Sequence, residues 1–512
     1  MTRIGEFLTV LCDQSNINYV FFRKFAFGHD DVSPLSKSFS DGRNGWGATI
    51  VDAMSTMSIM GLDGRLAEAI SFSSKIDFSR SKTPDTVSVF ESTIRYLGGL
   101  LSTYELSGKK FPALVDRARD IAHARLSHIV HQNNVIPFGF LNFTNNSPTV
   151  ANSNIAEAGT LSLEWATLSK YTGNGTYADL TVNALAHIAQ LPAPLPGLAA
   201  QGIDPRTGQF VGGYVSWGGG SDSYFEYLIK HARLSNTNNP LFADTWLTAV
   251  DSSIKNLLKE STVGDHLYLA DFDSSRQIRH VGSHLACFYG GNWLFGGRLL
   301  NNQTIVNIAL QLVDACWNTY ASTATGIGPE AFAFISDDGN FTGGSAPTQA
   351  QLDFYNQHGF YVTNGVYILR PEVLESNFYA FRVTGDTKYL DRAAAAVKSF
   401  NQFLATPNGF VGLNDVTAPS KGQIDDTESF WYGEVLKYLY LTFDDPEHIH
   451  LDRYVFNTEA QPFEAPALRN QYGSGQPLPP IPGFAPKSVG APLPAISPNV
   501  KVGSPISHTG DT

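Results

Sequence analysis

The sequence is poor in cysteine and in charge. It has 3 cysteines in 512 residues, Cys12, Cys287 and Cys316, too few for a disulfide scaffold and without the spacing of a zinc site. One structural disulfide with one odd thiol remains open. Only 16% of the residues are charged, the net charge is −12, and there is no basic run. A nucleic-acid partner is therefore not expected, because phosphate neutralisation needs clustered lysine and arginine.

The sequence also lacks a targeting or membrane segment. No stretch of about 20 apolar residues could span a membrane. The first residues include Glu6 and Asp13 and only a short apolar run, which makes a poor signal peptide. Acceptor sites of the Asn-x-Ser/Thr type nevertheless favour a secreted chain over a cytosolic one. We therefore expect a secretory or extracellular protein in which residues 1–19 are not the natural start. The acceptor sites are Asn142, Asn145, Asn174, Asn302 and Asn340.

Several catalytic motifs are missing, but one repeated feature is present. There is no Gly-x-Ser-x-Gly nucleophile motif, no phosphate-binding loop and no metal-binding histidine pair. A glutamate or histidine instead recurs beside apolar, aromatic-rich stretches, at intervals between 56 and 88 residues. Such a period fits one helical hairpin per unit, repeated around a ring or solenoid. The six positions are Glu91, Glu164, Glu226, His284, Glu372 and Glu428.

After residues 1–19, hydrophobic periodicity and turn residues divide the chain into two parts. Residues 20–468 form a helical body, in which loops 130–155, 192–221 and 323–366 should hold short strands or line the site. From residue 469 to 512 proline is frequent and core-forming residues are scarce, which predicts a disordered or extended tail. Helices are predicted at 44–62, 87–106, 157–171, 222–235, 284–300, 305–322, 371–384, 388–404 and 428–443.

Acidic residues in apolar surroundings are the candidates for chemistry. Hydrolysis of a glycosidic bond with inversion needs one carboxylic acid and one carboxylate base, spaced to admit a water. Any one of these acids alone is more readily explained as a helix cap or as a buried partner of Arg95 or Arg370. Eight of them in a chain this poor in charge favour a shared pocket. They are Glu91, Glu157, Asp222, Glu226, Glu372, Glu375, Glu434 and Glu459.

Five segments carry a resemblance to a known family. They are Phe27-Gly-His-Asp-Asp31, Val89-Phe-Glu91-Ser-Thr-Ile-Arg95-Tyr-Leu-Gly-Gly, Asp222-Ser-Tyr-Phe-Glu226-Tyr-Leu-Ile-Lys, Leu369-Arg-Pro-Glu372-Val-Leu-Glu375-Ser and Phe456-Asn-Thr458-Glu459-Ala. In unbroken order over about residues 20–465, they resemble class I α-1,2-mannosidases, glycoside hydrolase family 47. The phrase Gly326-Ile-Gly-Pro-Glu330 is similar to the fungal secreted branch. The resemblance implies an all-α fold, an (α/α)7 barrel with minor β-hairpins in its loops.

The resemblance also implies roles for individual residues. Glu91 would be the general acid, acting through a water, Glu372 the general base, and Asp222 a second essential carboxylate near the attacking water. Thr458 would bind one Ca2+ through its carbonyl and hydroxyl oxygens, and the ion would hold two hydroxyls of the mannose being cleaved. Cys287 and Cys316 would form the family's disulfide, which leaves Cys12 free. The substrate-binding residues would be Arg95, Glu157, Glu226, His284, Arg370, Glu375, Phe430, Glu434 and Glu459.

The chain departs from the family pattern at several positions. Ser55, Thr427 and Gln461 stand where the family usually has aspartate, methionine and histidine. Gly220 stands where the narrow, endoplasmic-reticulum type has an arginine two residues before the aspartate that matches Asp222. Glycine there predicts broad trimming of all α-1,2-linked mannoses toward the five-mannose glycan.

Three functions are weighed against one another. The first is a monomeric, calcium-dependent α-1,2-mannosidase acting on high-mannose N-glycans of glycoproteins. The second is a catalytically impaired mannose-glycan-binding relative acting in glycoprotein quality control, and the third is an (α/α)-barrel hydrolase of another sugar. The complete set of Glu91, Asp222 and Glu372 favours the first, because a lectin needs no such set.

Overall fold

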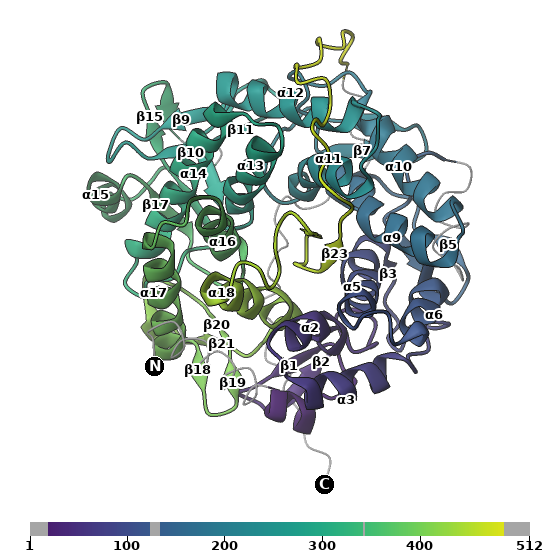
Figure 1. Cartoon of the computed structure of the whole chain (residues 1–512). Helices are drawn as coiled ribbons and strands as arrows, with labels where there is room; N and C mark the ends of the chain where they lie inside the picture. Colours follow the sequence, from purple (N-terminus) through teal and green to yellow (C-terminus); the bar gives the residue numbers. More distant parts are fainter. Residues whose placement is uncertain (1–18, 123–133, 341–343, 486–512) are drawn as a thin grey trace.

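In the computed structural model, residues 19–122, 134–340 and 344–485 are described. The predictions for residues 1–18, including the free thiol of Cys12, lie outside these ranges. Seven helical segments of the described chain form a closed inner ring in which each contacts the next (Figure 1). They are α2 (Ala48–Ile59), η1 with α5 (Ser92–Leu97, Gly98–Leu106), α9 (Ser162–Thr172), α11 (Asp222–Ser235), α13 (Phe288–Leu299), α16 (Glu372–Thr384), and η5 with α18 (Trp431–Val435, Leu436–Phe443).

A second layer of helices covers the outside of the ring. Each packs against the inner helix that precedes it in the chain, which completes a helical hairpin. Helical residues 19–25 take the corresponding place beside η5, where the rings of Phe22 and Tyr432 lie 6.3 Å apart. The architecture is the predicted (α/α)7 barrel. The remaining outer helices are α3 (Asp63–Ser73), α6 (Pro112–Ile121), α10 (Thr176–Ala189), α12 (Leu241–Asn256), α14 (Gln303–Ala321) and α17 (Lys388–Phe403).

The predicted helices are present, but some of their limits were wrong. The range 157–171 is two helices, α8 (Ile155–Gly159) and α9, because Thr160 leaves the helical conformation at φ −99° and ψ 62°. The range 87–106 begins as strand β3 and becomes helical at α4 (Val89–Glu91). Helices α3, α6, α10, α12 and α15 (Gln349–His358) were not predicted. In α6 only Leu114, Ala118 and Ile121 are buried, an i, i+4, i+7 stripe in an otherwise polar segment.

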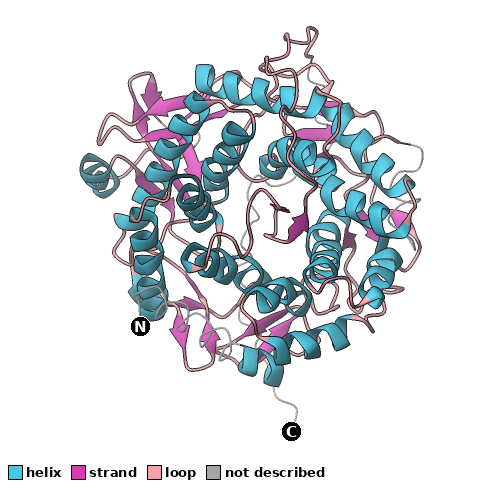
Figure 2. Ribbon diagram, in the orientation of Figure 1, coloured by secondary structure: helices cyan, strands magenta, loops and turns pink. Residues whose placement is uncertain are grey.

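Short antiparallel strands occupy the loops between helices (Figure 2), as predicted for those loops. The three-stranded sheets are β3 (Val87–Ser88), β4 (Phe140–Asn142) and β5 (Ser147–Pro148); β6 (Ser153–Asn154), β7 (Gly202–Asp204) and β8 (Gln209–Val211); and β13 (Val281–Ser283), β14 (Ala331–Ala333) and β17 (Tyr361–Asn364). The hairpins are β1 (Asp31–Ser33) with β2 (Ser38–Ser40), β9 (Leu258–Glu260) with β10 (Leu267–Leu269), β11 (Asp271–Phe272) with β12 (Ile278–Arg279), β15 (Ile335–Ser336) with β16 (Gly339–Asn340), β18 (Ala405–Thr406) with β19 (Gly409–Phe410), β20 (Gly412–Leu413) with β21 (Gln423–Ile424), and β22 (Tyr454–Phe456) with β23 (Pro462–Glu464). Two 3-10 turns complete the list, η3 (Leu285–Cys287) and η4 (Pro419–Lys421).

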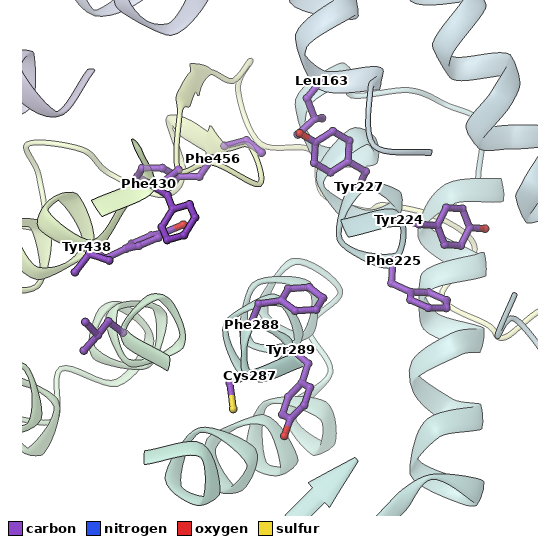
Figure 3. Close-up of a cluster of buried hydrophobic side chains, with 14 of the residues drawn as sticks. Leu163, Tyr224, Phe225, Tyr227, Cys287, Phe288, Tyr289, Phe430, Tyr438 and Phe456 are labelled. Carbon is purple, nitrogen blue, oxygen red and sulfur yellow. The ribbon is translucent and has the colours of Figure 1, made fainter. Parts of the chain in front are cut away.

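The hairpin β22–β23 lies in the middle of the helical ring (Figure 1). Its turn, residues 457–461, is tied to the inner helices by buried polar groups. Asn457 Nδ2 donates to the Ile94 carbonyl at 2.9 Å, and Lys437 Nζ donates to the Ala460 carbonyl at 2.6 Å. Aromatic rings fill the space around the hairpin, as with Phe456 and Tyr438, whose centroids lie 6.0 Å apart (Figure 3). The hairpin therefore closes the barrel from inside and fixes the position of its own turn.

Two further links hold the barrel together. Cys287, before inner helix α13, forms the predicted disulfide with Cys316 on outer helix α14. Residues 466–485 run in extended form along the outside of α11 and α12 (Figure 1), and the Ser474 amide donates to Asp244 Oδ1 at 2.7 Å. Residues 486–512 of the predicted tail lie outside the described chain. Within the described ranges, no helix has both the length and the apolar character needed to cross a membrane.

Candidate active site

A cavity of about 490 Å³ opens above the turn of the central hairpin. Inner helices deliver their first residues to it: Asp222 begins α11 and Glu372 begins α16. The positive end of a helix dipole favours a carboxylate there. Every predicted site residue except His284 lines this cavity. They are Glu91, Arg95, Glu157, Asp222, Glu226, Arg370, Glu372, Glu375, Phe430, Glu434, Thr458 and Glu459.

Glu91 is held by two arginines. Arg95 Nε lies 2.6 Å from Glu91 Oε2, and Arg43 Nε lies 3.7 Å from the same oxygen. Burial alone would raise the pKa of Glu91, but the charges and hydrogen bonds of Arg95 and Arg43 outweigh it and the pKa lies below its ordinary value. Arg95 also pairs with Glu459 and reaches Asp52 at 3.4 Å. The salt bridge between Arg95 and Glu91 is thus one part of a network of charged groups at the cavity.

Glu372 is oriented by a histidine that stands behind it. His284 Nδ1 lies 2.6 Å from Glu372 Oε2, and His284 Nε2 lies 2.8 Å from the Tyr320 hydroxyl. Burial raises the pKa of Glu372, but the hydrogen bond and charge of His284, with the charge of Arg370, bring the pKa below its ordinary value. His284 therefore acts on the site through Glu372 and does not line the cavity.

The side chain of Arg370, which lines the cavity, is held in place by Glu330. Its Nε and Nη2 atoms donate to the two carboxylate oxygens of Glu330 at 2.6 and 2.8 Å, a bidentate pair. Arg370 Nη1 lies 3.9 Å from Glu372 Oε1. Glu330 comes from the Gly-Ile-Gly-Pro-Glu phrase, so that motif supplies the support for Arg370.

Among the described residues, no cationic side chain pairs with Asp222. Its Oδ1 accepts hydrogen bonds from the Ser223 amide at 2.8 Å and the Ser223 hydroxyl at 3.3 Å. Burial, with the negative charges of Glu226 and Glu372, raises the pKa of Asp222 to about 7. Asp222 and Glu372 therefore differ in the direction of their pKa shifts, a difference typical of paired catalytic carboxyls.

The floor of the cavity is crowded with carboxyl groups around Thr458. Burial and the charge of Glu226 raise the pKa of Glu375 well above its ordinary value. Burial and the charges of Glu459 and Glu375 do the same to Glu434. Among these acids, Glu226 pairs with Lys230 one helical turn later, and Glu459 pairs with Arg95, which leaves more carboxyl groups than cations. Such a cluster is costly without a cation or shared protons.

Two of the inner helical segments that carry cavity residues contain a π-helical turn. Arg95 lies in the π-helical segment Ser92–Leu97, and Glu434 lies in Trp431–Val435. A π-helical turn inserts an extra residue into the helix and so changes the direction of the side chains that follow, and such turns occur frequently at functional sites. Periodicity in the sequence gives no sign of them, because it is read at 3.6 residues per turn.

Sequence reasoning missed several residues of the site. Arg43 pairs with Asp31 at 2.9 Å and with Glu428 at 2.7 Å, besides its contact with Glu91. A lone arginine in a glycine-rich turn gives no local signal of this role. Phe140 at the rim of the cavity is 38% exposed, which could be noticed only on the folded surface.

Glu164, one of the six recurring positions, lies away from the cavity. Its Oε1 accepts from the Tyr227 hydroxyl at 2.5 Å and from Asn457 Nδ2 at 2.7 Å. Burial raises the pKa of Glu164 to about 8. Its contact is with the central hairpin, so Glu164 supports the turn that carries Thr458.

Comparison with known proteins decides the family. The family model for glycosyl hydrolase family 47 matches residues 16–465. The chain belongs to glycosyl hydrolase family 47. Two curated members of the family show the extent of the likeness: the probable mannosyl-oligosaccharide α-1,2-mannosidase 1B of Aspergillus clavatus is 40% identical over 86% of this chain and 89% of its own. The mannosyl-oligosaccharide α-1,2-mannosidase 1B of Aspergillus phoenicis is 39% identical over 86% and 88%.

A solved family 47 structure has the same fold. The α-1,2-mannosidase of Trichoderma reesei superposes with a TM-score of 0.86 at 34% identity, over 90% of this chain and 99% of that protein. The match extends over almost the whole of the solved enzyme, so the barrel, its central hairpin and the cavity between them belong to one family 47 domain.

Proposed function

We propose that this family 47 protein is a hydrolase that removes terminal α-1,2-linked mannose from high-mannose N-glycans with inversion. The observation that carries the proposal is the meeting of Glu91, Asp222 and Glu372 in one cavity, although they come from three inner helices and span 281 positions of the sequence. The names of the relatives, mannosyl-oligosaccharide α-1,2-mannosidases, supply the substrate.

Glu372 is suited to be the base of the reaction. The contacts of His284 and Arg370 favour its ionised form, so it can accept a proton from the attacking water. Glu91 is the acid, giving its proton to the leaving oxygen through a water. The charge of Glu372 contributes to the raised pKa of Asp222, so the two carboxyl groups interact. Asp222 helps to position the attacking water.

The donor set around Thr458 fits Ca2+. The described residues include no group of three or more His, Cys, Asp or Glu side chains placed as direct metal ligands. Thr458 offers only oxygens, and the same cavity is lined by the carboxylates of Glu226, Glu375, Glu434 and Glu459, which can hold bound waters. A hard cation that accepts oxygen and water ligands matches this set. When bound, Ca2+ would engage sugar hydroxyls and offset the negative charge of the floor.

The impaired, glycan-binding alternative finds no support in the site. All three proposed catalytic acids are present, and each has the polar contacts described above. A binding protein would have no need of a base oriented by His284 and Tyr320.

We infer broad trimming toward the five-mannose glycan from the wall beside Asp222. Gly219 and Gly220 line the cavity there, and neither has a side chain that could restrict the branch beyond the scissile sugar. The proposed partners are high-mannose glycans on glycoproteins, as the names of the relatives indicate.

We also propose that the protein works in the secretory pathway or outside the cell. The disulfide between Cys287 and Cys316 is typical of an oxidising compartment. Asn145, Asn174 and Asn340, three of the five acceptor asparagines, are exposed and accessible to glycosylation.

Substitution of the three acids tests the function. Glu91→Gln, Asp222→Asn and Glu372→Gln should each lower turnover of an α-1,2-linked mannose disaccharide at least about a hundredfold, the usual scale for acid–base groups. The exposed Glu447→Gln is the control and should keep full activity. Proton NMR should show β-mannose as the first product, before mutarotation. Early α-mannose would exclude inversion, and near wild-type rates in all three variants would move the active site elsewhere.

A further inference from the structure

A second cavity of about 390 Å³ adjoins the active-site cavity. Gly219 lines both of them, so the two cavities are neighbours at the glycine-rich wall beside Asp222. The second cavity, here called the side cavity, extends from that wall to Tyr214, Asp271 and Arg279. None of these three residues takes part in the mechanism proposed above.

Polar groups of the side cavity are arranged in pairs. The Tyr214 hydroxyl donates to Asp271 Oδ2 at 2.6 Å. Burial raises the pKa of Asp271 to about 6, against hydrogen bonds from Tyr214 and Ser216. Arg279 Nε donates to Asp273 Oδ2 at 2.7 Å. The cavity thus presents a tyrosine–carboxylate pair and an arginine–carboxylate pair.

The walls that carry these pairs are rigid. Val215 and Phe272 exchange backbone hydrogen bonds of 2.7 and 2.9 Å, which joins the glycine-rich segment to strand β11. Asp273 Oδ1 accepts from the amides of Ser275 and Gln277, both at 2.9 Å, which fixes the β11–β12 turn. Polar groups held in this way are placed before a ligand arrives, and binding costs little further ordering.

A glycine between two serine hydroxyls leaves space in the side cavity. A Cβ at Gly218 would lie 3.1 Å from Ser216 Oγ and 3.3 Å from Ser283 Oγ. The glycine therefore leaves both hydroxyls free of a covering side chain in the wall of the side cavity. Hydroxyl, carboxylate and guanidinium groups around a small, half-enclosed space are suited to the hydroxyls of a neutral sugar.

An anionic ligand does not fit this set. Arg279 is the cationic side chain of the cavity and is already paired with Asp273, while Asp271 adds a second carboxyl. A phosphate or a sugar acid would meet more negative than positive charge. A neutral hexose meets no such penalty.

We propose that the side cavity binds a mannose residue of a second branch of the same glycan whose terminal mannose occupies the active site. The inference rests on the proposed function and adds a subsite to it. Branches leave a common core, so a second contact on one branch raises the local concentration of the other at the catalytic acids. The side cavity would then favour branched glycans over short linear ones.

Matched tyrosine variants test the subsite. Tyr214→Phe removes the hydroxyl that faces Asp271, and Asp271→Asn removes the charge. Tyr171→Phe is the control, because its half-buried hydroxyl likewise donates at 2.6 Å to a carboxylate, Glu105, outside both cavities. Michaelis parameters would be measured on a nine-mannose N-glycan and on an α-1,2-linked mannose disaccharide, with melting temperatures for each variant.

The two substrates separate the possible outcomes. We expect Tyr214→Phe and Asp271→Asn to raise KM for the nine-mannose glycan about three- to tenfold, the loss of one hydrogen bond, and to leave the disaccharide unchanged. Equal KM values for wild type and both variants on the nine-mannose glycan would overturn the subsite while leaving the mannosidase intact. An equal loss on both substrates would also overturn it, since the residues would then act through the fold. A wild-type protein inactive on both substrates would overturn the proposed function and the subsite together.

Discussion

Ser55 and Gln461 form a buried hydrogen bond across the barrel. Ser55 Oγ on α2 donates to Gln461 Oε1, at the end of the central turn, at 2.6 Å, and both side chains are fully buried. The backbone N–H of Gln461 donates to Asn457 Oδ1 at 2.8 Å. The family pattern has aspartate and histidine at these two positions. The two departures therefore fall on residues that contact each other in this structure.

Removal of one partner should destabilise the protein. Ser55→Ala leaves Gln461 Oε1 buried without a donor, which should lower the free energy of unfolding by about 1–3 kcal/mol. The double variant Ser55→Asp with Gln461→His restores the usual pair and should be more stable than Ser55→Asp alone. Chemical denaturation measures both. A Ser55→Ala variant as stable as the wild type would contradict the role of this bond.

Chelation of calcium should abolish activity and lower the melting temperature. An ion that binds only the native state stabilises it, by about 2.7 kcal/mol at a hundredfold excess over Kd. Differential scanning calorimetry with EDTA and with added Ca2+ measures the shift. Thr458→Ala removes one proposed ligand oxygen and should reduce the shift. Full activity after prolonged dialysis against EDTA would exclude the calcium site.

Activity should fall as pH rises above neutrality. A general acid works only when protonated, and Arg95 and Arg43 lower the pKa of Glu91 below its ordinary value. Above that pKa the protonated fraction of Glu91 decreases about tenfold per pH unit. Glu372, whose pKa is also lowered, stays ionised over the same range. Asp222, whose pKa is about 7, also titrates between pH 5 and 9. Rates of disaccharide hydrolysis are therefore compared above neutral pH, where Asp222 is ionised, and a rate that rises from there toward alkaline pH would remove Glu91 from the acid role.

Trimming of a nine-mannose glycan should continue to the five-mannose form. Mass spectrometry of a time course would show successive losses of all α-1,2-linked mannoses, whereas arrest after one mannose would contradict broad specificity. Gly220→Arg is a poor test of this idea. Gly220 has φ +87°, and a Cβ there would lie 2.9 Å from Nε2 of the buried Gln201. That variant should lose stability before it can show a change of branch preference.

Much of the fold could be predicted from the sequence. Apolar periodicity gave the inner helices, because their buried faces are long, and three of the six recurring positions, Glu91, Glu226 and Glu372, lie in the cavity. Outer helices such as α6 were missed because few of their residues are buried. The π-helical turns at Arg95 and Glu434 were missed because they interrupt the period on which helix prediction depends.

The sequence by itself determined which residues are available: the acids, Thr458 in its motif and the cysteines of the disulfide. The tertiary structure decided which of them act on one another. Arg43 lies between Glu91 and Glu428, and His284 lies behind Glu372, in each case through contacts between residues far apart in the chain. Local pattern carries no record of such contacts, because they exist only once the ring of helices has closed. The pKa of each carboxyl follows from those contacts and from burial, so it too is a property of the closed barrel.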